Sequence, residues 1–599
     1  MTLTTELKGD IGDWIWRVGL RQTEISSLLS LSMKDNEKEL RELEGLKKVW
    51  EEECLIPALK EHPERREKFI TDIGLEIERV YTPHHLQQVD FDYKEDLGFP
   101  GQYPFTRGIT PTMYRSEPWM IRAYSGFGDP YVCNERYKKL VECGVDEIVM
   151  AVDLPTQVGY DSDHIMARGE VGKVGVAIDT LRDMEVLFEG IPLNRLKRVS
   201  MLGNSFGPIA LALFIALGEK QGLKTADFVV DLQNDILKEY VARGTYIFPI
   251  RPSVRVTTDV IGYCAKHARH WYPSTLCCNH LNAAGAGSTK AVAFALSNGT
   301  CYINHLLGQG YQIDEIAPLF SMFLDERLDF FTAICNFRAA RRAWAKIMKE
   351  KFKAQDPRSM ALKITAYSHG GETLLEPINN IARITLAALA YVLGGVQFLY
   401  NASHDEVLGT PTEEAAKISV RIQQILAHEL GITNTIDPLG GSYFIETVTS
   451  KIEEEIHKEF EKVEALGGAI SAIDKGYYLA AIIDGANRRQ REFERGERVS
   501  IGVNKWKLES RIPFGAFRID PAIEQRQVER LKQVKKERNE KTVRETLEYV
   551  REVVQGEGNL VPPCIEAIRA YGTVGEICDV LRGVFGEYQV REYFSAKGS

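Results

Sequence analysis

Short apolar segments that alternate with longer helical patterns constrain the fold of this 599-residue chain more than any other feature. Each segment is rich in β-branched, aromatic and aliphatic residues, which is typical of parallel strands joined by crossover helices. Eight such segments within about 300 residues favour a closed (β/α)8 TIM barrel over an open sheet. They span residues 147–153, 198–204, 227–234, 274–280, 319–325, 360–369, 396–402 and 433–438.

Each of the segments contains a polar residue at or near its carboxyl end. A barrel of this kind places its active site at the carboxyl ends of its strands, so these residues are candidates for the mouth of a site. Polar residues also end strands that have no function, and both interpretations stay open for each position. The residues are Asp153, Asn204, Asn234, His280, Asp325, His369, Asn401 and Asp437.

The regions on either side of these segments have a different composition. Residues 1–95 are largely charged and helix-favouring, and residues 446–599 return to charged helical patterns. We therefore predict an N-terminal helical arm (1–95), a substrate-binding barrel (96–445) and a helical C-terminal extension (446–599). The start of the barrel region, GFPGQYPFTRGITPTMY, is rich in Gly, Pro and aromatic residues and is expected to be irregular.

Charge and cysteine usage exclude several classes of protein. The net charge is −10 and basic residues are interleaved with acidic ones, which argues against nucleic acid as a partner. The ten cysteines form no CxxC pair, so a structural zinc site is not expected. No apolar run approaches the 18 residues of a membrane span, and MTLTTELKGDIGDW has no apolar signal core. We expect a cytoplasmic protein that does not bind membranes.

The stretch DLPTQVGYDSDHIMARGEVGKVGVAID (153–179) follows the first predicted strand and carries several carboxylates. Its spacing matches neither an EF-hand, nor a pair of histidines on one helix face, nor a phosphate-binding loop. We predict a rigid loop that hydrogen-bonds to itself and shapes the mouth of the barrel. The chain also lacks an HExxH motif and the protein-kinase motifs.

Several longer stretches are similar to the methylmalonyl-CoA mutase family of adenosylcobalamin-dependent acyl-CoA mutases. The resemblance extends from about residue 95 to 590 and implies an isomerase that rearranges the carbon skeleton of a short acyl-CoA by a radical route. The matching stretches are TMYRSEPWMIRAYSGFG (112–128), 152–180, QNDILKEYVARGTYIFPIRPSVR (233–255), NHLNAAGAG (279–287), 379–395, HDEVLGTPTE (404–413), IDPLGGSYFIE (436–446), IGVNK (501–505) and 572–588.

The resemblance also implies partners. In this family the acyl-CoA runs along the barrel axis, and a flavodoxin-like module with a DxHxxG motif holds the cobalamin. No DxHxxG occurs in this sequence. The resemblance therefore implies a large subunit that works with a small cobalamin-binding subunit, which holds most of the adenosylcobalamin. A G-protein chaperone is a further expected partner.

Four matched residues are expected at the reacting centre. His280 matches the histidine that donates a hydrogen bond to the thioester carbonyl, where negative charge develops, and Gln233 matches a neighbour of the same carbonyl. Arg243 and Tyr124 match the pair that binds the second carboxylate of methylmalonyl- or succinyl-CoA. The planar guanidinium group of an arginine can bind a carboxylate through two parallel hydrogen bonds. The alternative is that Arg243 pairs with a carboxylate of the protein itself in an internal salt bridge.

The remaining matches are assigned to substrate and cofactor binding, and no metal ligand is expected. The expected substrate-binding residues also include Arg122, Ser200, Ser321, Thr112 and Met113. Glu406 is expected to bind the adenosyl ribose, together with Asn401.

Five positions depart from the family pattern. Glu117 and Leu319 stand where the family has arginines that help bind CoA, Val149 and Leu202 replace small polar residues on the axis, and Ala283 replaces a glutamate. A carboxylate at a phosphate-binding position would repel the ligand.

Two alternatives to the leading interpretation stay open. The first is a mutase-like binding or scaffold subunit with altered catalysis. The second is a mutase for an unusual acyl thioester of the isobutyryl, hydroxyisobutyryl or alkylsuccinyl type. A barrel lyase or aldolase would need a lysine at a strand end, and none of the eight segments ends in one.

Overall fold

The computed structural model describes residues 38–369, 373–508, 520 and 522–590, which separate into two compact units. The first unit contains described residues 38–70 and 75–91. In it, helical residues 38–50, the π-helical turn η1 (Glu51–Leu55) and α3 (Ile56–Glu61) follow one another, and α4 (Pro83–Gln88) stands apart in the sequence. The second unit contains residues 71–74 and the described residues from 92 onward.

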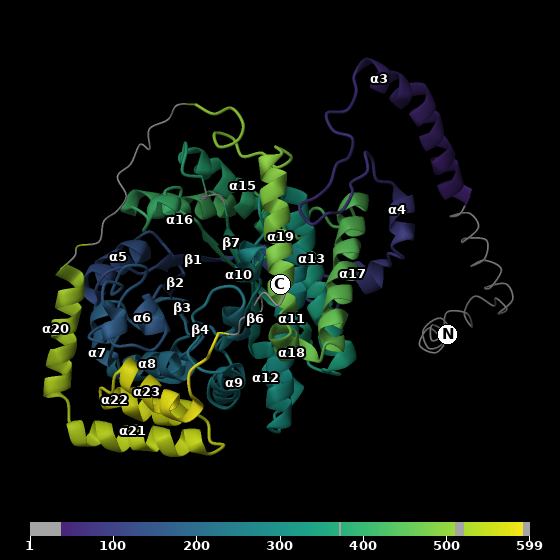
Figure 1. The fold of residues 1–599 in the computed structure, drawn as a ribbon. Helices are drawn as coiled ribbons and strands as arrows, with labels where there is room; N and C mark the ends of the chain where they lie inside the picture. The colour runs from purple at the N-terminus through teal and green to yellow at the C-terminus, as the bar shows by residue number, and fades with distance from the viewer. Residues whose placement is uncertain (1–37, 370–372, 509–519, 521, 591–599) are drawn as a thin grey trace, which may run out of the picture. The chain divides into compact units, whose positions relative to one another are not determined.

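The second unit is built on eight parallel strands in the order β4-β3-β2-β1-β8-β7-β6-β5. Tyr272 closes the ring between β4 and β5, because its N–H donates to Val230 O (2.9 Å) and its O accepts from Leu232 N (2.9 Å). Figure 1 shows the strands at the centre with helices around them, and the predicted (β/α)8 barrel is confirmed. The strands are β1 (Met120–Ser125), β2 (Glu147–Met150), β3 (Arg198–Leu202), β4 (Val230–Gln233), β5 (Ser274–Cys277), β6 (Phe320–Leu324), β7 (Lys363–Ser368) and β8 (Phe398–Asn401).

Seven of the eight predicted segments contain a strand, and the prediction for residues 433–438 is wrong. Asp437 in that segment has a positive φ of 48°, which breaks an extended conformation, and it accepts a hydrogen bond from Arg107 Nε (3.2 Å). The missing strand is β1, which follows the stretch 98–114 and lies in none of the eight predicted segments. The segment 147–153 therefore contains the second strand, and Arg243 follows the fourth strand, β4.

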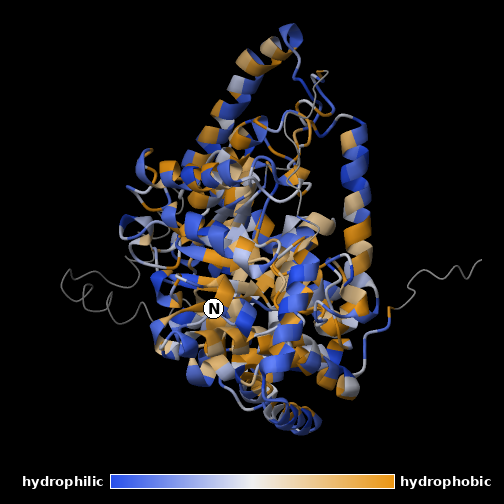
Figure 2. Ribbon diagram, turned by 90° about the vertical axis from the view of Figure 1, so that its left-hand side faces the viewer, coloured by the Kyte–Doolittle hydropathy of each residue, from blue (hydrophilic) through white to orange (hydrophobic). Residues whose placement is uncertain are grey.

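Helices cover the outside of the barrel. The helix α8 is buried from Gly207 to Gly218, because it contacts β4 on one side and α22 on another. Other outer helices alternate hydrophilic and hydrophobic residues in Figure 2, as expected for helices with one face on the sheet. The barrel helices are α5 (Pro130–Glu142), α6 (Leu154–Gln157), α7 (Leu181–Leu187), α8 (Gly207–Lys220), α9 (Ile250–His267), α10 (Cys278–Ala284), α11 (Ser288–Gly308), α12 (Ile313–Ile316), α13 (Phe330–Lys346), α14 (Pro357–Met360), α15 (Asn379–Leu393) and α16 (Glu413–His428).

The C-terminal helices pack against the barrel in two groups. The first group, α17 (Tyr443–Ala465), α18 (Gly468–Asp474) and α19 (Tyr477–Glu494), lies beside α11 and α13. The second group, α20 (Ala522–Glu537), α21 (Glu540–Gln555), α22 (Val561–Arg569) and α23 (Val574–Phe585), lies near α7 and α8 (Figure 1). Among the described residues no helix is long and apolar enough to cross a membrane. All ten cysteines are described and free.

Candidate active site

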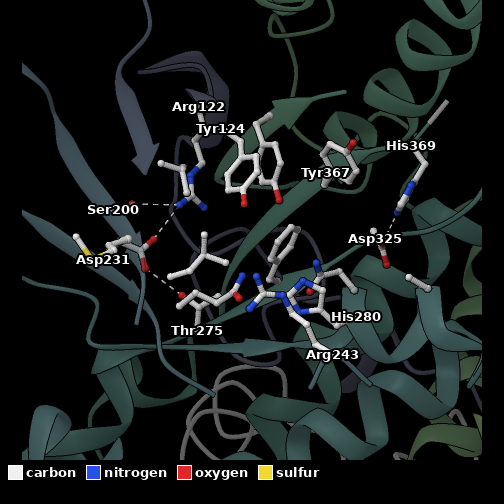
Figure 3. Close-up of a pocket in the computed structure, with 18 of the residues that line it drawn as sticks. Arg122, Tyr124, Ser200, Asp231, Arg243, Thr275, His280, Asp325, Tyr367 and His369 are labelled. Carbon is white, nitrogen blue, oxygen red and sulfur yellow. Dashed lines mark hydrogen bonds and ion pairs between the residues drawn. The ribbon is translucent and has the colours of Figure 1, made fainter. Parts of the chain in front are cut away.

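A cavity of about 250 Å3 lies at the carboxyl end of the barrel strands (Figure 3). The last residues of β3 and β4, the residue after β6 and the residue after β7 all line it. Among the predicted site residues, the structure brings seven together at this cavity: Arg122, Tyr124, Ser200, Gln233, Arg243, His280 and Glu406.

Arg243 reaches the cavity from the segment after β4, where it shares a carboxylate with a buried lysine. Its Nη1 is 3.3 Å from Glu239 Oε1 and 3.0 Å from Thr245 Oγ1. Glu239 also forms an ion pair with Lys238, and both of these side chains are fully buried. Burial raises the pKa of the nearby Asp235. The internal salt bridge of Arg243 is therefore present, and Arg243 shares its carboxylate with Lys238.

His280 lies near the start of α10, directly after β5, and its Nδ1 has no hydrogen-bond partner among the described residues. Burial lowers the pKa of His280 well below its ordinary value, and the positive charges of Lys238 and Arg243 lower it further. The ring is therefore neutral at pH 7, and one nitrogen can donate to a bound carbonyl. Gln233 stands beside the same cations, and its Oε1 accepts from Lys238 Nζ (3.2 Å).

Aromatic residues of β1, β7 and β8 form one wall of the cavity. The ring centroid of Tyr400 lies 6.3 Å from that of Tyr124 and 4.8 Å from that of Tyr367. The Tyr367 hydroxyl donates to Glu406 Oε1 at 2.5 Å, and burial raises the pKa of Glu406. Tyr124, Glu406 and Asn401 also line a second cavity of about 440 Å3. The two expected cofactor-binding residues therefore share one surface next to the first cavity.

The other predicted substrate-binding residues lie at or beyond the cavity floor. Arg122 and Ser200 form part of the floor, whereas Ser321 lies on β6 with its Oγ 2.8 Å from Thr275 Oγ1 and does not line the cavity. Thr112 and Met113 precede β1 at the amino end of the barrel. The structure does not bring these last three residues to the reacting centre.

The sequence identified two further functional candidates, Asp325 and His369, only as polar residues at strand ends. Asp325 and His369 form a hydrogen bond across the cavity from Arg122 (Figure 3). Their position after two adjacent strands, β6 and β7, was the available signal. Of the departures from the family pattern, Val149, Leu202 and Ala283 line the cavity.

The loop at 153–179 is held by its own hydrogen bonds, as predicted, and also by the C-terminal extension. Asp153 caps α6 by accepting from Thr156 N (3.0 Å), and it also accepts from Gly172 N (2.8 Å). Asp161 accepts from Thr573 Oγ1 (2.7 Å) and Gly575 N (2.7 Å). In the part of the chain that the structure describes, no group of three or more His, Cys, Asp or Glu residues is arranged to hold a metal ion.

Comparison with known proteins identifies the family. The family model described as methylmalonyl-CoA mutase matches residues 70–587. The chain is 40% identical to the 2-hydroxyisobutanoyl-CoA mutase large subunit of Aquincola tertiaricarbonis, over 92% of this chain and 98% of that protein. It is 39% identical to the methylmalonyl-CoA mutase of Rhizobium meliloti (strain 1021), over 86% and 72% of the two chains. It is 38% identical to the mitochondrial methylmalonyl-CoA mutase of Homo sapiens, over 87% and 69%. The chain therefore belongs to the methylmalonyl-CoA mutase family, whose members are cobalamin-dependent isomerases.

Proposed function

We propose that this chain is the large subunit of an adenosylcobalamin-dependent mutase that isomerises a short acyl thioester with a second carboxylate, of the methylmalonyl or succinyl type. The observation that carries the proposal is the meeting of Arg243, Tyr124, His280 and Gln233 at one cavity, where Arg243 shares the carboxylate of Glu239 with the buried Lys238. An uncharged acyl group would leave Arg243 with only this shared carboxylate, whereas a second carboxylate on the substrate would pair with its guanidinium.

Each of these residues has a role that its chemistry supports. The guanidinium of Arg243 binds the second carboxylate through two parallel hydrogen bonds, and the Tyr124 hydroxyl donates a further one. His280, neutral because of its lowered pKa, donates to the thioester carbonyl and stabilises the negative charge that develops there. The Gln233 amide orients the same carbonyl.

The cofactor surface fits an adenosyl group. Glu406 offers a buried carboxylate that accepts hydrogen bonds from ribose hydroxyls, and Asn401 adds an amide on the same cavity. When bound, the adenosyl group supplies the hydrogen-atom abstraction that begins the rearrangement. The cobalamin is held mainly by a small partner subunit of the DxHxxG type, which the name of the relative from Aquincola tertiaricarbonis, a large subunit, supports.

Reconstitution tests the proposal. The chain is combined with a DxHxxG-type subunit and adenosylcobalamin, and turnover of methylmalonyl, isobutyryl and 2-hydroxyisobutyryl thioesters is measured. We expect a preference for methylmalonyl and a large loss of kcat/KM for it in Arg243→Gln. The matched control is Arg269→Gln, which removes an exposed arginine that pairs with Glu315.

Two results would overturn the proposal. The first is a preference of the parent protein for an uncharged acyl group. The second is an unchanged kcat/KM in Arg243→Gln. A stable complex that turns over none of the three thioesters would instead support a scaffold subunit.

A further inference from the structure

Two buried side chains donate hydrogen bonds to the side-chain oxygen of Gln233, the last residue of β4. Lys238 Nζ and Asn204 Nδ2 each lie 3.2 Å from Gln233 Oε1. The Lys238 side chain is fully buried, Asn204 is 3% exposed, and neither residue lines the cavity. Gln233 does line the cavity, and it is the one residue of β4 that is not buried. The two donors therefore hold the Gln233 amide from the side that faces away from the cavity.

The direction of these hydrogen bonds follows from the chemistry of the groups. An ammonium group only donates, so the Gln233 atom that faces Lys238 must be the oxygen. The Asn204 amide is fixed independently, because its Oδ1 accepts from the backbone N–H of Asp235 (3.1 Å) and its Nδ2 must then face Gln233. Turning the Gln233 amide over would place its NH2 group against two donors and leave all of them unpaired. Gln233 therefore presents N–H groups, and not its oxygen, to the cavity.

The Asn204 side chain is held in place by the turn that carries it. Gly203 N–H donates to Gln233 O (3.0 Å), which extends the pairing of β3 with β4 to the residue before Asn204. The Ser205 hydroxyl donates to Gln157 O, so the turn is anchored on its other side as well. Asn204 is therefore fixed before any ligand binds.

His280 supplies another N–H group at the same cavity. A carbonyl oxygen carries two lone pairs and can accept from two donors at once. Donors that are oriented before the reaction stabilise the negative charge that develops on such an oxygen. We propose that Asn204 and Lys238 are positioning residues, which hold the Gln233 amide so that its N–H donates to the thioester carbonyl beside His280. The proposal rests on the proposed function, which supplies the thioester.

A double-mutant cycle in the reconstituted pair of subunits, with adenosylcobalamin and a methylmalonyl thioester, tests this coupling. Gln233→Met should lower kcat about 100-fold, and Asn204→Leu about tenfold with little change in KM. In the Gln233→Met background, Asn204→Leu should change kcat less than about twofold, because its effect passes through the amide. The matched control, Asn298→Leu, removes a different hydrogen bond to Asp235 (3.3 Å) and should have the same effect in both backgrounds. Equal losses from Asn204→Leu in both backgrounds would overturn the proposal.

Gln233→Glu tests the direction of the amide without changing the buried donors. The two donors would hold one carboxylate oxygen, and the other oxygen would face the carbonyl oxygen of the substrate and repel it. Gln233→Glu should therefore lose more kcat/KM than Gln233→Met. An equal or higher kcat/KM in Gln233→Glu would show that the cavity accepts an oxygen at this position and would overturn the proposal, even if Asn204→Leu did not fold.

Infrared spectroscopy separates this proposal from the proposed function. Methylmalonyl-N-acetylcysteamine labelled with carbon-13 at the thioester carbonyl is bound to the full chain, and the stretching frequency of that carbonyl is measured. N–H donors lower the frequency, so we expect a shift to lower frequency in the parent protein and a smaller shift in both Gln233→Met and Asn204→Leu. A shift in Asn204→Leu equal to that of the parent would overturn this proposal alone. Absence of any shift in the parent protein would reject the proposed thioester site and this proposal together.

Discussion

Replacement of Glu147 by alanine should destabilise the barrel severely. Glu147 is fully buried, and its two carboxylate oxygens lie 2.7 Å from Arg122 Nη2 and 2.6 Å from Arg198 Nη2. Although burial opposes its ionisation, the two guanidinium groups hold the pKa of Glu147 below its ordinary value. Its removal leaves two buried cations facing one carboxylate, Asp231. Breaking a buried pair in this way costs about 3–5 kcal/mol of folding free energy.

The matched control removes a carboxylate from the same end of the barrel. The Glu117 side chain is 66% exposed and pairs with Lys197, so Glu117→Ala should cost at most about 1 kcal/mol. Equilibrium urea unfolding, followed by tryptophan fluorescence, compares both variants with the parent. The double variant Glu147→Met/Arg198→Met removes both charges at once. Its loss of folding free energy should be smaller than the sum of the losses in the single variants Glu147→Met and Arg198→Met. Equal losses for Glu147→Ala and Glu117→Ala would refute the buried-network reasoning.

Three further predictions concern the cofactor, a buried acid and the C-terminal extension. The isolated chain should bind adenosylcobalamin weakly and gain affinity with a DxHxxG-type partner; tight one-to-one binding without a partner in calorimetry would contradict this. Burial raises the pKa of Asp153 to about 6, so its contribution to stability is present at low pH and is lost as pH rises from about 4 to 6. The loss is about 3 kcal/mol, and Asp153→Asn should flatten the pH profile of urea unfolding in that window. Asp161→Ala removes acceptors for Thr573 and Gly575 and should speed hydrogen exchange in α23, whereas unchanged exchange would count against this docking.

The sequence predicted most of the barrel because apolar strands leave a pattern in the chain. β1 was missed because MIRAYS contains Arg122, and only the folded barrel shows that this charge is compensated inside it. Residues 433–438 appeared strand-like, but the backbone turns at Asp437. Local composition cannot reveal either a buried ion pair or a positive φ.

The site was predictable to the extent that motifs place residues at strand ends. The meeting of Arg243 with His280 and Gln233 at one cavity agrees with the expected reacting centre. The sharing of Glu239 between Lys238 and Arg243 was not predictable, because it depends on the turn after β4. The buried ion pairs among Arg122, Glu147, Arg198 and Asp231 were not predictable either, since residues from four strands form them and no single segment shows them.

Hydrogen transfer between cofactor and substrate tests the proposed function most directly. Adenosylcobalamin labelled with tritium at C5′ is incubated with the reconstituted pair of subunits and a methylmalonyl thioester, and the label in the recovered acyl group is counted. The account predicts that tritium appears in the methylmalonyl and succinyl groups and that transfer falls sharply in Arg243→Gln. Tritium that stays in the cofactor, or that enters an isobutyryl group more readily than a methylmalonyl group, would contradict the account.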